Sequence, residues 1–512
     1  MGFASTFAVG LNGVRGAVVR VEAYGHSGLP AYVVTGLADA ACAQAPDRVR
    51  AATSITGVAL TAQRWTLNLS PASVPKNGSG FDLALAVALL AADRKITARQ
   101  SADFGHIGEL GLDGTVRPVA GVLPMVLALS EAGVSNVMVP LGSAREAALV
   151  TGVRVIAVRD LADVLALYGR LAQGDEPPLL DIPHPRRAPT KHPDMSDVVG
   201  QPEARLGLEV AAAGRHHMLL IGPPGAGKTM LAERMPSVLP PLPYDQAMEV
   251  TSIHSVLGEL PGSEDLIERA PFVAPHHGAS MSAVIGGGSG RVRPGAVSRA
   301  HQGVLFLDEA PEFRRDVLDG LRQPLESGRV VIARAERHVH LPASFQLVLA
   351  ANPCPCGHGY GKGAKCTCTP AARRAYLAKL SGPLLDRMDV RLNVLPIARV
   401  DLMAPAGETS ADISARVLHA REKQRARWSA KSWQVNAQAP GRELRDGRFR
   451  LPGRVRSPID RALDRGDLTL RGYDRCLRVA WTVADLQGHE TPTADDLGVA
   501  LSLRNHGGAR AA

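Results

Sequence analysis

The segment "MLLIGPPGAGKTMLAERM" (residues 218–235) joins an apolar run, a glycine-rich loop and a helix-forming run. Its centre matches the phosphate-binding pattern G-x-x-x-x-G-K-[ST] in the strand–loop–helix context that the pattern requires, which argues against a coincidental glycine-rich turn. Lys228 is expected to reach the β- and γ-phosphates, and Thr229 to offer a hydroxyl to Mg²⁺. The predicted nucleotide-binding residues are Gly222, Pro223, Pro224, Gly225, Ala226, Gly227, Lys228 and Thr229.

Acidic side chains follow a second apolar run, in "GVLFLDEAPEF" (residues 303–313). Such a run is typical of a central parallel strand, whose carboxyl end is where ligands bind. Asp308 is expected to hold Mg²⁺ through water, and Glu309 to polarise the attacking water, although the acids could also cap the next helix. A third run, "FQLVLAAN", ends in Asn352, which is suited to orienting that water. The predicted cofactors are therefore ATP and Mg²⁺.

Longer segments extend these motifs into a family resemblance. The pattern of a strand and P-loop, "LFLDE" and a strand that ends in Asn resembles AAA+ ATPases. More narrowly, the chain resembles the magnesium-chelatase-like YifB/ComM proteins over essentially its whole length. The segments that carry the resemblance are "DVVGQPEARLGLEVAAAGRHHMLLIGPPGAGKTMLAERM", "APHHGASMSAVIGGG", "HQGVLFLDEAPEF", "LAANPCPCG" and "GPLLDRMDV".

The resemblance implies two arginines at the ATP site. Arg387 in "GPLLDRMD" matches the arginine finger that reaches the ATP of a neighbouring subunit in a ring. Arg471 in "LTLRGYDRCLRVA" matches the sensor-2 arginine of the helical lid. Both would offer a guanidinium group to charge developing on the γ-phosphate, and a surface salt bridge is the alternative for each. The predicted catalytic set is Glu309, Asn352, Arg387 and Arg471.

The amino-terminal region resembles the Lon-protease-type domain of ribosomal-S5-like fold, through "NLSPASVPKNGSGFDLALAVALLAA" and "GELGLDGTVRPVAGVLPMVLAL". In register, the catalytic serine of active Lon domains falls on Gly80 and the lysine that activates it falls on Leu123. Ser79 lies one residue early and has no lysine near Leu123 to activate it. A non-proteolytic domain used for interaction or assembly is predicted, with Lys76 as a surface or structural residue.

A hairpin is predicted in "SGRVVIARAERHVHLPASFQLVLAAN" (residues 327–352). Related AAA+ proteins carry such a hairpin into a central pore, where cations would follow DNA phosphates, but a solvated tip fits equally well. The predicted DNA contacts are Arg329, Arg334 and Arg337. A second pore-loop candidate is "IGGGSGRVRPG" (residues 285–295), whereas the basic helix face in "HAREKQRARW" (residues 419–428) is expected to be merely solvated.

Four of the six cysteines lie in "NPCPCGHGYGKGAKCTC" (residues 352–368). Four thiolates on two short arms could close a tetrahedral, structural Zn²⁺ site, although C-x-C arms differ from the C-x₂-C of zinc ribbons. Free thiols in a surface loop remain the alternative, and the cluster is not expected to be a catalytic centre. The candidate ligands are Cys354, Cys356, Cys366 and Cys368.

The pattern along the chain predicts several domains, because 512 residues exceed the size of one hydrophobic core. Residues 1–172 alternate strand-like and helical runs and are predicted to form the S5-like α/β domain. Residues 173–195 are rich in proline and charge and predict a linker. Residues 196–395 are predicted to form an AAA+ core with a doubly wound parallel sheet, and residues 396–512 an all-α lid.

Composition adds weaker constraints. The net charge of +9 favours a polyanionic partner such as DNA only slightly. The cysteines do not form a secreted disulfide pattern, and the longest apolar run, residues 83–92, is too short to span a bilayer. A cytoplasmic protein with no membrane partner is predicted.

The resemblance implies a homo-hexameric ring that hydrolyses ATP to remodel single-stranded or branched DNA. ComM-type helicase or branch-migration activity in recombination or transformation would fit this expectation. The alternative is a chelatase-type motor that acts on a protein partner during metal insertion, although the chain shows no integrin-type metal-binding module of its own.

Overall fold

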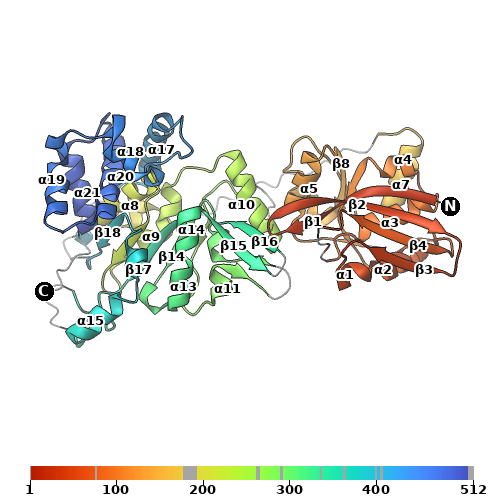
Figure 1. Ribbon diagram of the computed structural model, residues 1–512, viewed down its shortest axis with the longest axis horizontal. Helices are drawn as coiled ribbons and strands as arrows, with labels where there is room; N and C mark the ends of the chain where they lie inside the picture. Colours follow the sequence, from red (N-terminus) through yellow and green to blue (C-terminus); the bar gives the residue numbers. More distant parts are fainter. Residues whose placement is uncertain are drawn as a thin grey trace.

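The computed structural model describes residues 2–74, 76, 78–176, 193–260, 266–288, 292–334, 337–360, 365–397, 401–403 and 407–505. The described part forms an elongated molecule with an amino-terminal lobe at one end and a larger lobe at the other (Figure 1). Most of the predicted linker, residues 177–192, lies outside the described residues.

A mixed sheet of seven strands organises the amino-terminal lobe, in the order β3-β4-β2-β1-β5-β8-β9. β1 and β2 form a long antiparallel hairpin, and β5, β8 and β9 extend the sheet in parallel. The strands are β1 (Gly2–Asn12), β2 (Arg15–His26), β3 (Ala31–Thr35), β4 (Arg64–Ser70), β5 (Phe104–His106), β8 (Asn136–Pro140) and β9 (Arg154–Val158), with the small pair β6 (Glu109–Leu110) and β7 (Val116–Arg117).

One helix, apolar after its first residue Asp82, fills the core of this lobe. Every residue of α3 (Asp82–Ala92) is buried, and its hydrophobic side chains join the core formed with β1, β2 and β4. The helix predicted at residues 83–92 is therefore present and buried. Lys76 is buried as well, with its ammonium group donating to the carbonyl of Pro71, so the surface alternative for this lysine is wrong. The other helices are α1 (Ala40–Ala43), α2 (Ala45–Ile55), α4 (Ala98–Ser101), α5 (Val122–Glu131), η1 (Leu141–Ser143), α6 (Ala144–Ala147) and α7 (Leu161–Ala172).

A five-stranded parallel sheet organises the larger lobe, in the order β11-β14-β17-β10-β18. Successive residues of its strands belong alternately to two hydrophobic cores, one on each face: Leu220 and Phe306 in one, Leu219 and Leu305 in the other. Burial on both faces explains why these strands are uninterrupted apolar runs. The α/β prediction with a parallel sheet is confirmed. The strands are β10 (Met218–Ile221), β11 (Phe272–Val273), β14 (Val304–Leu307), β17 (Gln346–Ala351) and β18 (Val390–Asn393).

Two hairpins and a set of helices surround this sheet. The hairpins are β12 (Gly286–Gly287) with β13 (Arg293–Pro294), and β15 (Arg329–Arg334) with β16 (Arg337–Pro342). The helices are η2 (Met195–Asp197), α8 (Pro202–Gly214), α9 (Lys228–Val238), α10 (Tyr244–Leu257), α11 (Met281–Val284), α12 (Ala296–Arg299), η3 (Ala310–Glu312), α13 (Arg315–Gly320), α14 (Arg322–Ser327), α15 (Pro370–Leu377), α16 (Gly382–Leu385) and η4 (Asp401–Met403).

The carboxyl-terminal segment is helical and shares its core with one face of the parallel sheet. Trp428, Tyr473 and Trp481 pack in the same hydrophobic cluster as Leu220 and Phe306. Figure 1 shows these helices gathered over one end of the larger lobe. They are α17 (Ser410–Arg427), η5 (Asn436–Gln438), α18 (Gly441–Arg445), η6 (Gly447–Phe449), α19 (Gly453–Asp464), α20 (Leu470–Gln487) and α21 (Ala494–Asn505).

Helix α10 joins the two lobes. The Gly121 amide donates to the Ser255 carbonyl at 3.0 Å, and Met248 packs into the amino-terminal core. The turn between β1 and β2 also contacts hairpin β15–β16: a Cβ added at Gly13 would lie 2.8 Å from a methyl carbon of Val339. Strand β16 of the predicted DNA-contacting hairpin is therefore packed against the amino-terminal lobe.

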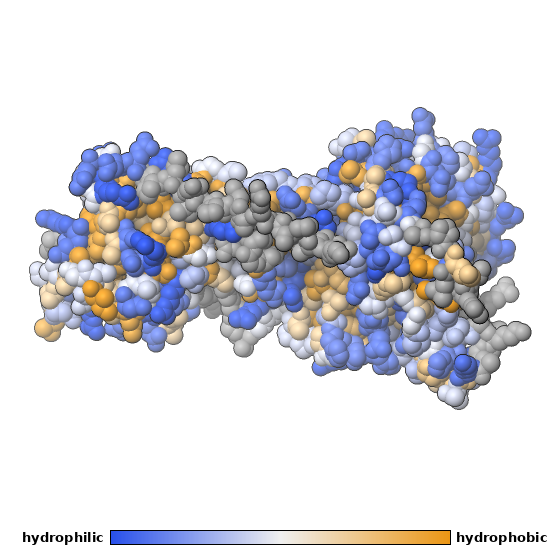
Figure 2. Space-filling model, turned by 180° about the vertical axis from the view of Figure 1, so that it is seen from behind, coloured by the Kyte–Doolittle hydropathy of each residue, from blue (hydrophilic) through white to orange (hydrophobic). Residues whose placement is uncertain are grey.

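Hydrophilic residues predominate on the face seen in Figure 2, with hydrophobic residues in small scattered groups. Within the described ranges, every helix is too short or too polar to cross a membrane.

Candidate active site

The predicted nucleotide site lies at the carboxyl edge of the parallel sheet. The P-loop follows β10, Asp308 follows β14 and Asn352 follows β17, and these three strands are immediate neighbours. Because the strands are parallel, all three segments leave the sheet at the same edge. Adjacency in the sheet thus brings together residues that lie up to 130 positions apart in the chain.

Backbone geometry explains two glycines of the P-loop. A Cβ at Gly222 would lie 2.1 Å from the carbonyl oxygen of Val394, so no other residue fits between β10 and the segment after β18. Gly227 has φ +88°, a left-handed conformation that favours glycine, and it precedes the first turn of α9. The loop therefore leaves the first N–H groups of α9 free to face a phosphate, if one binds at this edge of the sheet.

Lys228 and Thr229 contact the residues predicted to act with them. The Lys228 ammonium group donates to Asn352 Oδ1 at 3.1 Å and to the Gly222 carbonyl at 2.6 Å. Thr229 Oγ1 donates to Asp308 Oδ2 at 2.7 Å. Burial lowers the pKa of Lys228, and the carboxylates of Asp308 and Glu309 oppose that shift. The structure thus joins the four predicted site residues in two hydrogen-bonded pairs, Lys228 with Asn352 and Thr229 with Asp308.

The oxygen donors suit a magnesium ion. Mg²⁺ prefers oxygen ligands and keeps several waters, and the Thr229 hydroxyl and Asp308 carboxylate supply such oxygens side by side. When bound there, Mg²⁺ would neutralise phosphate charge. Lys228 would hold the phosphates in position from the other side.

Glu309 adopts a strained backbone conformation. Its φ is +49°, which is uncommon for a residue with a side chain, and its amide donates to Asp308 Oδ1 at 2.9 Å. Strain of this kind costs about 1–3 kcal/mol and is concentrated at functional sites. The carboxylate also lies 3.5 Å from His277 Nδ1. The sequence pattern predicts no role for His277, which lies in the segment "APHHGAS".

Arg387 and Arg471 lie apart from the P-loop and the acids after β14. They line one cavity of ≈ 310 Å³ with Asp386 and Arg475, and no described P-loop residue lines it. Arg387 comes before β18, at the amino edge of the sheet, and a four-residue strand separates the two edges by about 13 Å. Arg387 pairs with Glu326, and burial lowers its pKa, with Arg475, Arg471 and Arg322 adding to the effect. These arginines are therefore placed away from the P-loop of their own chain.

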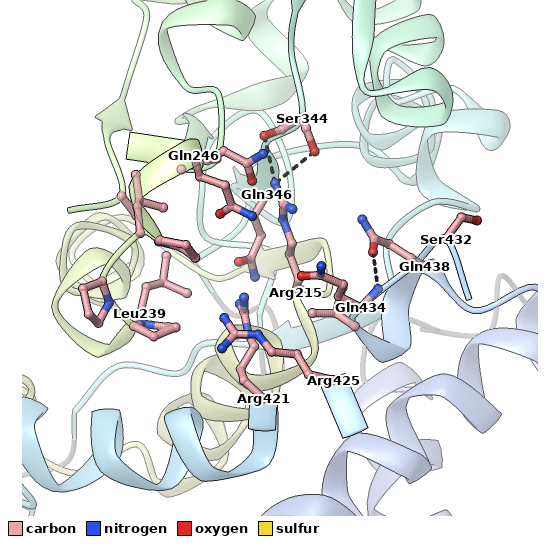
Figure 3. Close-up of a pocket in the computed structure, with 18 residues that line it drawn as sticks. Arg215, Leu239, Gln246, Ser344, Gln346, Arg421, Arg425, Ser432, Gln434 and Gln438 are labelled. Atoms are coloured by element: carbon pink, nitrogen blue, oxygen red, sulfur yellow. Dashed lines mark hydrogen bonds between the residues drawn. The ribbon is translucent and has the colours of Figure 1, made fainter. Parts of the chain in front are cut away.

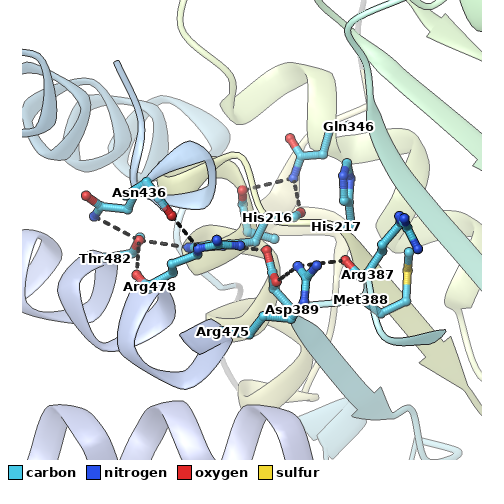
Figure 4. Close-up of polar contacts among 12 residues, drawn as sticks. His216, His217, Gln346, Arg387, Met388, Asp389, Asn436, Arg475, Arg478 and Thr482 are labelled. Carbon is cyan, nitrogen blue, oxygen red and sulfur yellow. Dashed lines mark hydrogen bonds and ion pairs between the residues drawn. The ribbon is translucent and has the colours of Figure 1, made fainter. Parts of the chain in front are cut away.

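A chain of buried hydrogen bonds connects the Arg387 segment to the carboxyl-terminal helices (Figure 4). Arg475 donates to the Arg387 carbonyl at 3.2 Å and also pairs with Asp389. Asp389 Oδ2 lies 2.9 Å from His216 Nδ1, and His216 Nε2 lies 2.8 Å from Thr482 Oγ1. Burial disfavours the Asp389 carboxylate, but Arg475 and His216 outweigh it and hold its pKa well below the usual range. A shift of α20 would therefore move the backbone at Arg387.

The four clustered cysteines come together as predicted. The Sγ atoms of Cys354, Cys356 and Cys366 are separated by 3.4, 3.7 and 3.6 Å, and Cys368 completes a group within 4.8 Å. Four sulfurs bound to zinc at 2.3 Å in a tetrahedron would be about 3.8 Å apart, so the set fits that ion.

The cysteine loop also touches the P-loop. A Cβ at Gly357 would lie 2.6 Å from Pro224 Cδ, so the two loops pack closely. A structural metal there would support the nucleotide loop.

The hairpin predicted to contact DNA is present as β15–β16, and Arg329 at its base is exposed. The side chains of Arg334 and Arg337 lie outside the described part of the molecule. In the second candidate loop, Arg291 is not described, whereas Arg293 is exposed.

In the amino-terminal lobe, Ser79 and Gly80 line a cavity of ≈ 260 Å³. Ser79 donates to Glu109, and Leu123 is buried in the core. The described partner of Ser79 is therefore a carboxylate, and Leu123 stands where the resemblance would require the activating lysine. The non-proteolytic role stays a prediction.

Three family profiles match the chain. They are described as magnesium chelatase, subunit ChlI, over residues 194–402; subunit ChlI of Mg-chelatase, over residues 21–143; and magnesium chelatase, subunit ChlI C-terminal, over residues 407–504.

Relatives resemble the chain over almost its whole length. An uncharacterized protein of Mycobacterium tuberculosis is 46% identical over 517 aligned positions, covering 100% of both chains. Competence protein ComM of Haemophilus influenzae is 37% identical, covering 98% of each. The uncharacterized protein YifB of Escherichia coli is 38% identical, covering 96% of this chain and 95% of its own.

Replacing Glu309 by Gln should separate nucleotide binding from hydrolysis. The amide keeps the shape of the side chain but cannot accept a proton, so phosphate release should fall about 10²- to 10⁴-fold while ATP binding persists. Phosphate release and binding of a fluorescent ATP analogue would be measured together. Glu312→Gln, an exposed acid three residues away, is the matched control and should retain activity. Undiminished turnover in Glu309→Gln would rule out its role as the base.

Proposed function

The chain belongs to the magnesium-chelatase-like AAA+ family that includes ComM and YifB, and from this premise we propose that it is a ring-forming ATPase that remodels DNA. The observation that carries the ATPase part is the convergence of Lys228, Thr229, Asp308 and Asn352 at one edge of the sheet. Glu309, next to Asp308, would take the proton of the attacking water. Lys228 would stabilise charge that develops on the transferred phosphoryl group.

A ring explains the position of the two arginines. Arg387 and Arg471 share a cavity at the sheet edge opposite their own P-loop, so neither is placed to reach the ATP of its own chain. In a closed ring with head-to-tail contacts, that surface would face the P-loop edge of a neighbouring subunit. Each active site would then be completed by two chains, and a homo-hexamer is the assembly proposed.

The DNA part of the proposal rests on charge. The chain carries a net charge of +9, and exposed Arg293, Arg329 and His338 lie on the two hairpins beside the sheet. Cations presented from each subunit of a ring would follow a phosphate backbone. The relationship to a competence protein supports the same substrate, and ComM-type branch migration or unwinding in recombination or transformation, within the cytoplasm, is the proposed setting.

A second candidate is favoured by the family profiles, whose descriptions name magnesium chelatase. In this alternative, the same ATPase would act on a protein partner during metal insertion. The ATP site is common to both proposals. They differ in whether DNA or a protein partner changes the rate of ATP hydrolysis.

DNA should stimulate ATP hydrolysis if the first proposal holds. ATPase rates would be measured with single-stranded, forked and four-way-junction DNA, together with strand separation or junction migration. Stimulation should decrease as salt is raised, because the contacts would be made to phosphates. Arg329→Glu should weaken the stimulation without changing the basal rate, whereas Arg461→Glu on α19 is the control. A rate that no DNA changes, without unwinding, would favour the chelatase-type motor.

We also propose that the four-cysteine cluster holds a structural Zn²⁺. Purified protein should contain about one zinc per chain, because four thiolates fill a closed tetrahedral site. Cys354→Ser should lower the zinc content and the thermal stability, whereas Cys476→Ser, a buried thiol remote from the cluster in sequence, should keep the metal. If metal analysis finds no zinc in the wild-type protein, the proposal is wrong and the four cysteines are free thiols.

A further inference from the structure

A cavity lined by arginines lies at the amino edge of the parallel sheet (Figure 3). Its volume is ≈ 230 Å³. Arg215 enters it just before β10, and Ser344 and Gln346 enter it at the start of β17. Arg421 and Arg425 reach it from α17 on the opposite wall. The cavity is therefore shared between the sheet and the carboxyl-terminal helices, at the edge away from the P-loop.

The polar side chains that line this cavity are either positively charged or uncharged. Besides the three arginines, it presents the hydroxyls of Ser344 and Ser432 and five glutamines: Gln246, Gln302, Gln346, Gln434 and Gln438. No aspartate or glutamate is found among the described residues that line it. Three guanidinium groups without a carboxylate leave a net positive charge in a confined space.

The contacts of the arginines do not neutralise that charge. Arg215 donates to the carbonyl and hydroxyl oxygens of Ser344, at 2.9 and 3.0 Å. Arg421 donates to the carbonyls of Ala212 and Ala213, at 2.6 and 3.0 Å. Arg425 is exposed, and within the described part of the chain it has no hydrogen-bond or ion-pair partner. Neutral acceptors orient two of the groups, and the third is left unpaired.

The cost of holding these guanidinium groups close together and partly buried appears in the pKa values of Arg421 and Arg215. Burial lowers the pKa of Arg421 to about 9, and repulsion from Arg215 and Arg425 adds to this shift. Burial alone lowers the pKa of Arg215 to about 10. A bound anion would relieve both effects, because it would offset desolvation and separate the like charges.

This arrangement corrects the expectation that the basic run at residues 419–428 is a solvated helix face. Gln424 and Trp428 are buried, and Arg427 pairs with the buried Asp485. Arg421 faces the cavity. The run therefore forms one wall of a pocket.

We propose that this cavity binds a small phosphorylated anion, held by Arg215 on the sheet side and by Arg421 and Arg425 on the helical side. Guanidinium groups form paired hydrogen bonds with phosphate oxygens, and the amides and hydroxyls around them complete the polar lining. The cavity volume of ≈ 230 Å³ suits a compact phosphate or diphosphate. A bound anion would connect the sheet to the carboxyl-terminal helices. The proposal does not depend on the ATPase or DNA assignments.

Binding can be measured by titration calorimetry with inorganic pyrophosphate and inorganic phosphate. The full chain would carry Lys228→Ala and Thr229→Ala, so that the P-loop does not contribute. One site per chain is expected for pyrophosphate, with affinity that falls as ionic strength rises. Arg425→Gln removes an exposed cation with little structural role and should weaken binding at least about tenfold, because hydrogen bonds to charged groups are strong.

Two further variants control the measurement. Arg421→Gln should weaken binding as well, and tryptophan fluorescence would check that α17 still packs against Trp481. Arg461→Gln, an exposed arginine on α19 outside the cavity, should leave binding unchanged. The proposal would be overturned by no binding of either anion, by equal affinity in the Arg425→Gln protein, or by DNA binding that depends on Arg425 and that pyrophosphate does not displace.

Discussion

Parallel strand pairing between β10, β14 and β17 is the interaction on which the site depends. Each strand is buried on both faces, so its register is held by two hydrophobic cores at once. A slip by one residue would exchange the two sets of side chains and is strongly disfavoured. Because the strands run in one direction, Lys228, Asp308 and Asn352 must all emerge at the same edge. The chemistry therefore follows from the direction and order of the strands.

The same sheet also separates two kinds of cationic site. The carboxyl edge carries the P-loop, whereas the amino edge carries the Arg387 cavity and the arginine-lined cavity around Arg421. The buried bonds from His216 to Asp389 and Thr482 tie this second edge to the carboxyl-terminal helices. Movement of the helices relative to the sheet would change both cationic cavities together. In the proposed ring, this arrangement would couple the nucleotide state of one subunit to the helices of its neighbour.

Motifs that depend only on residues close together in the chain could be predicted from the sequence. The positions of the P-loop, of the acids after β14 and of the four cysteines match the structure, because each depends on short spacing or on a strand end, while their roles stay predictions. The Arg421 cavity was missed because its walls come from residues more than 200 positions apart, and only folding shows that no carboxylate joins them. His277 was missed for a similar reason, since its closeness to Glu309 depends on how the segment before α11 crosses the sheet edge. The strained φ of Glu309 also has no marker in the sequence.

In the proposed ring, each ATP site is completed by two chains. Mixing Arg387→Ala subunits with Glu309→Gln subunits tests it directly, because each variant alone should be nearly inactive. In mixed rings, an intact Glu309 of one chain would meet an intact Arg387 of its neighbour, and part of the ATPase activity should return. A mixture that exchanges subunits yet remains as inactive as either variant alone would contradict the claim.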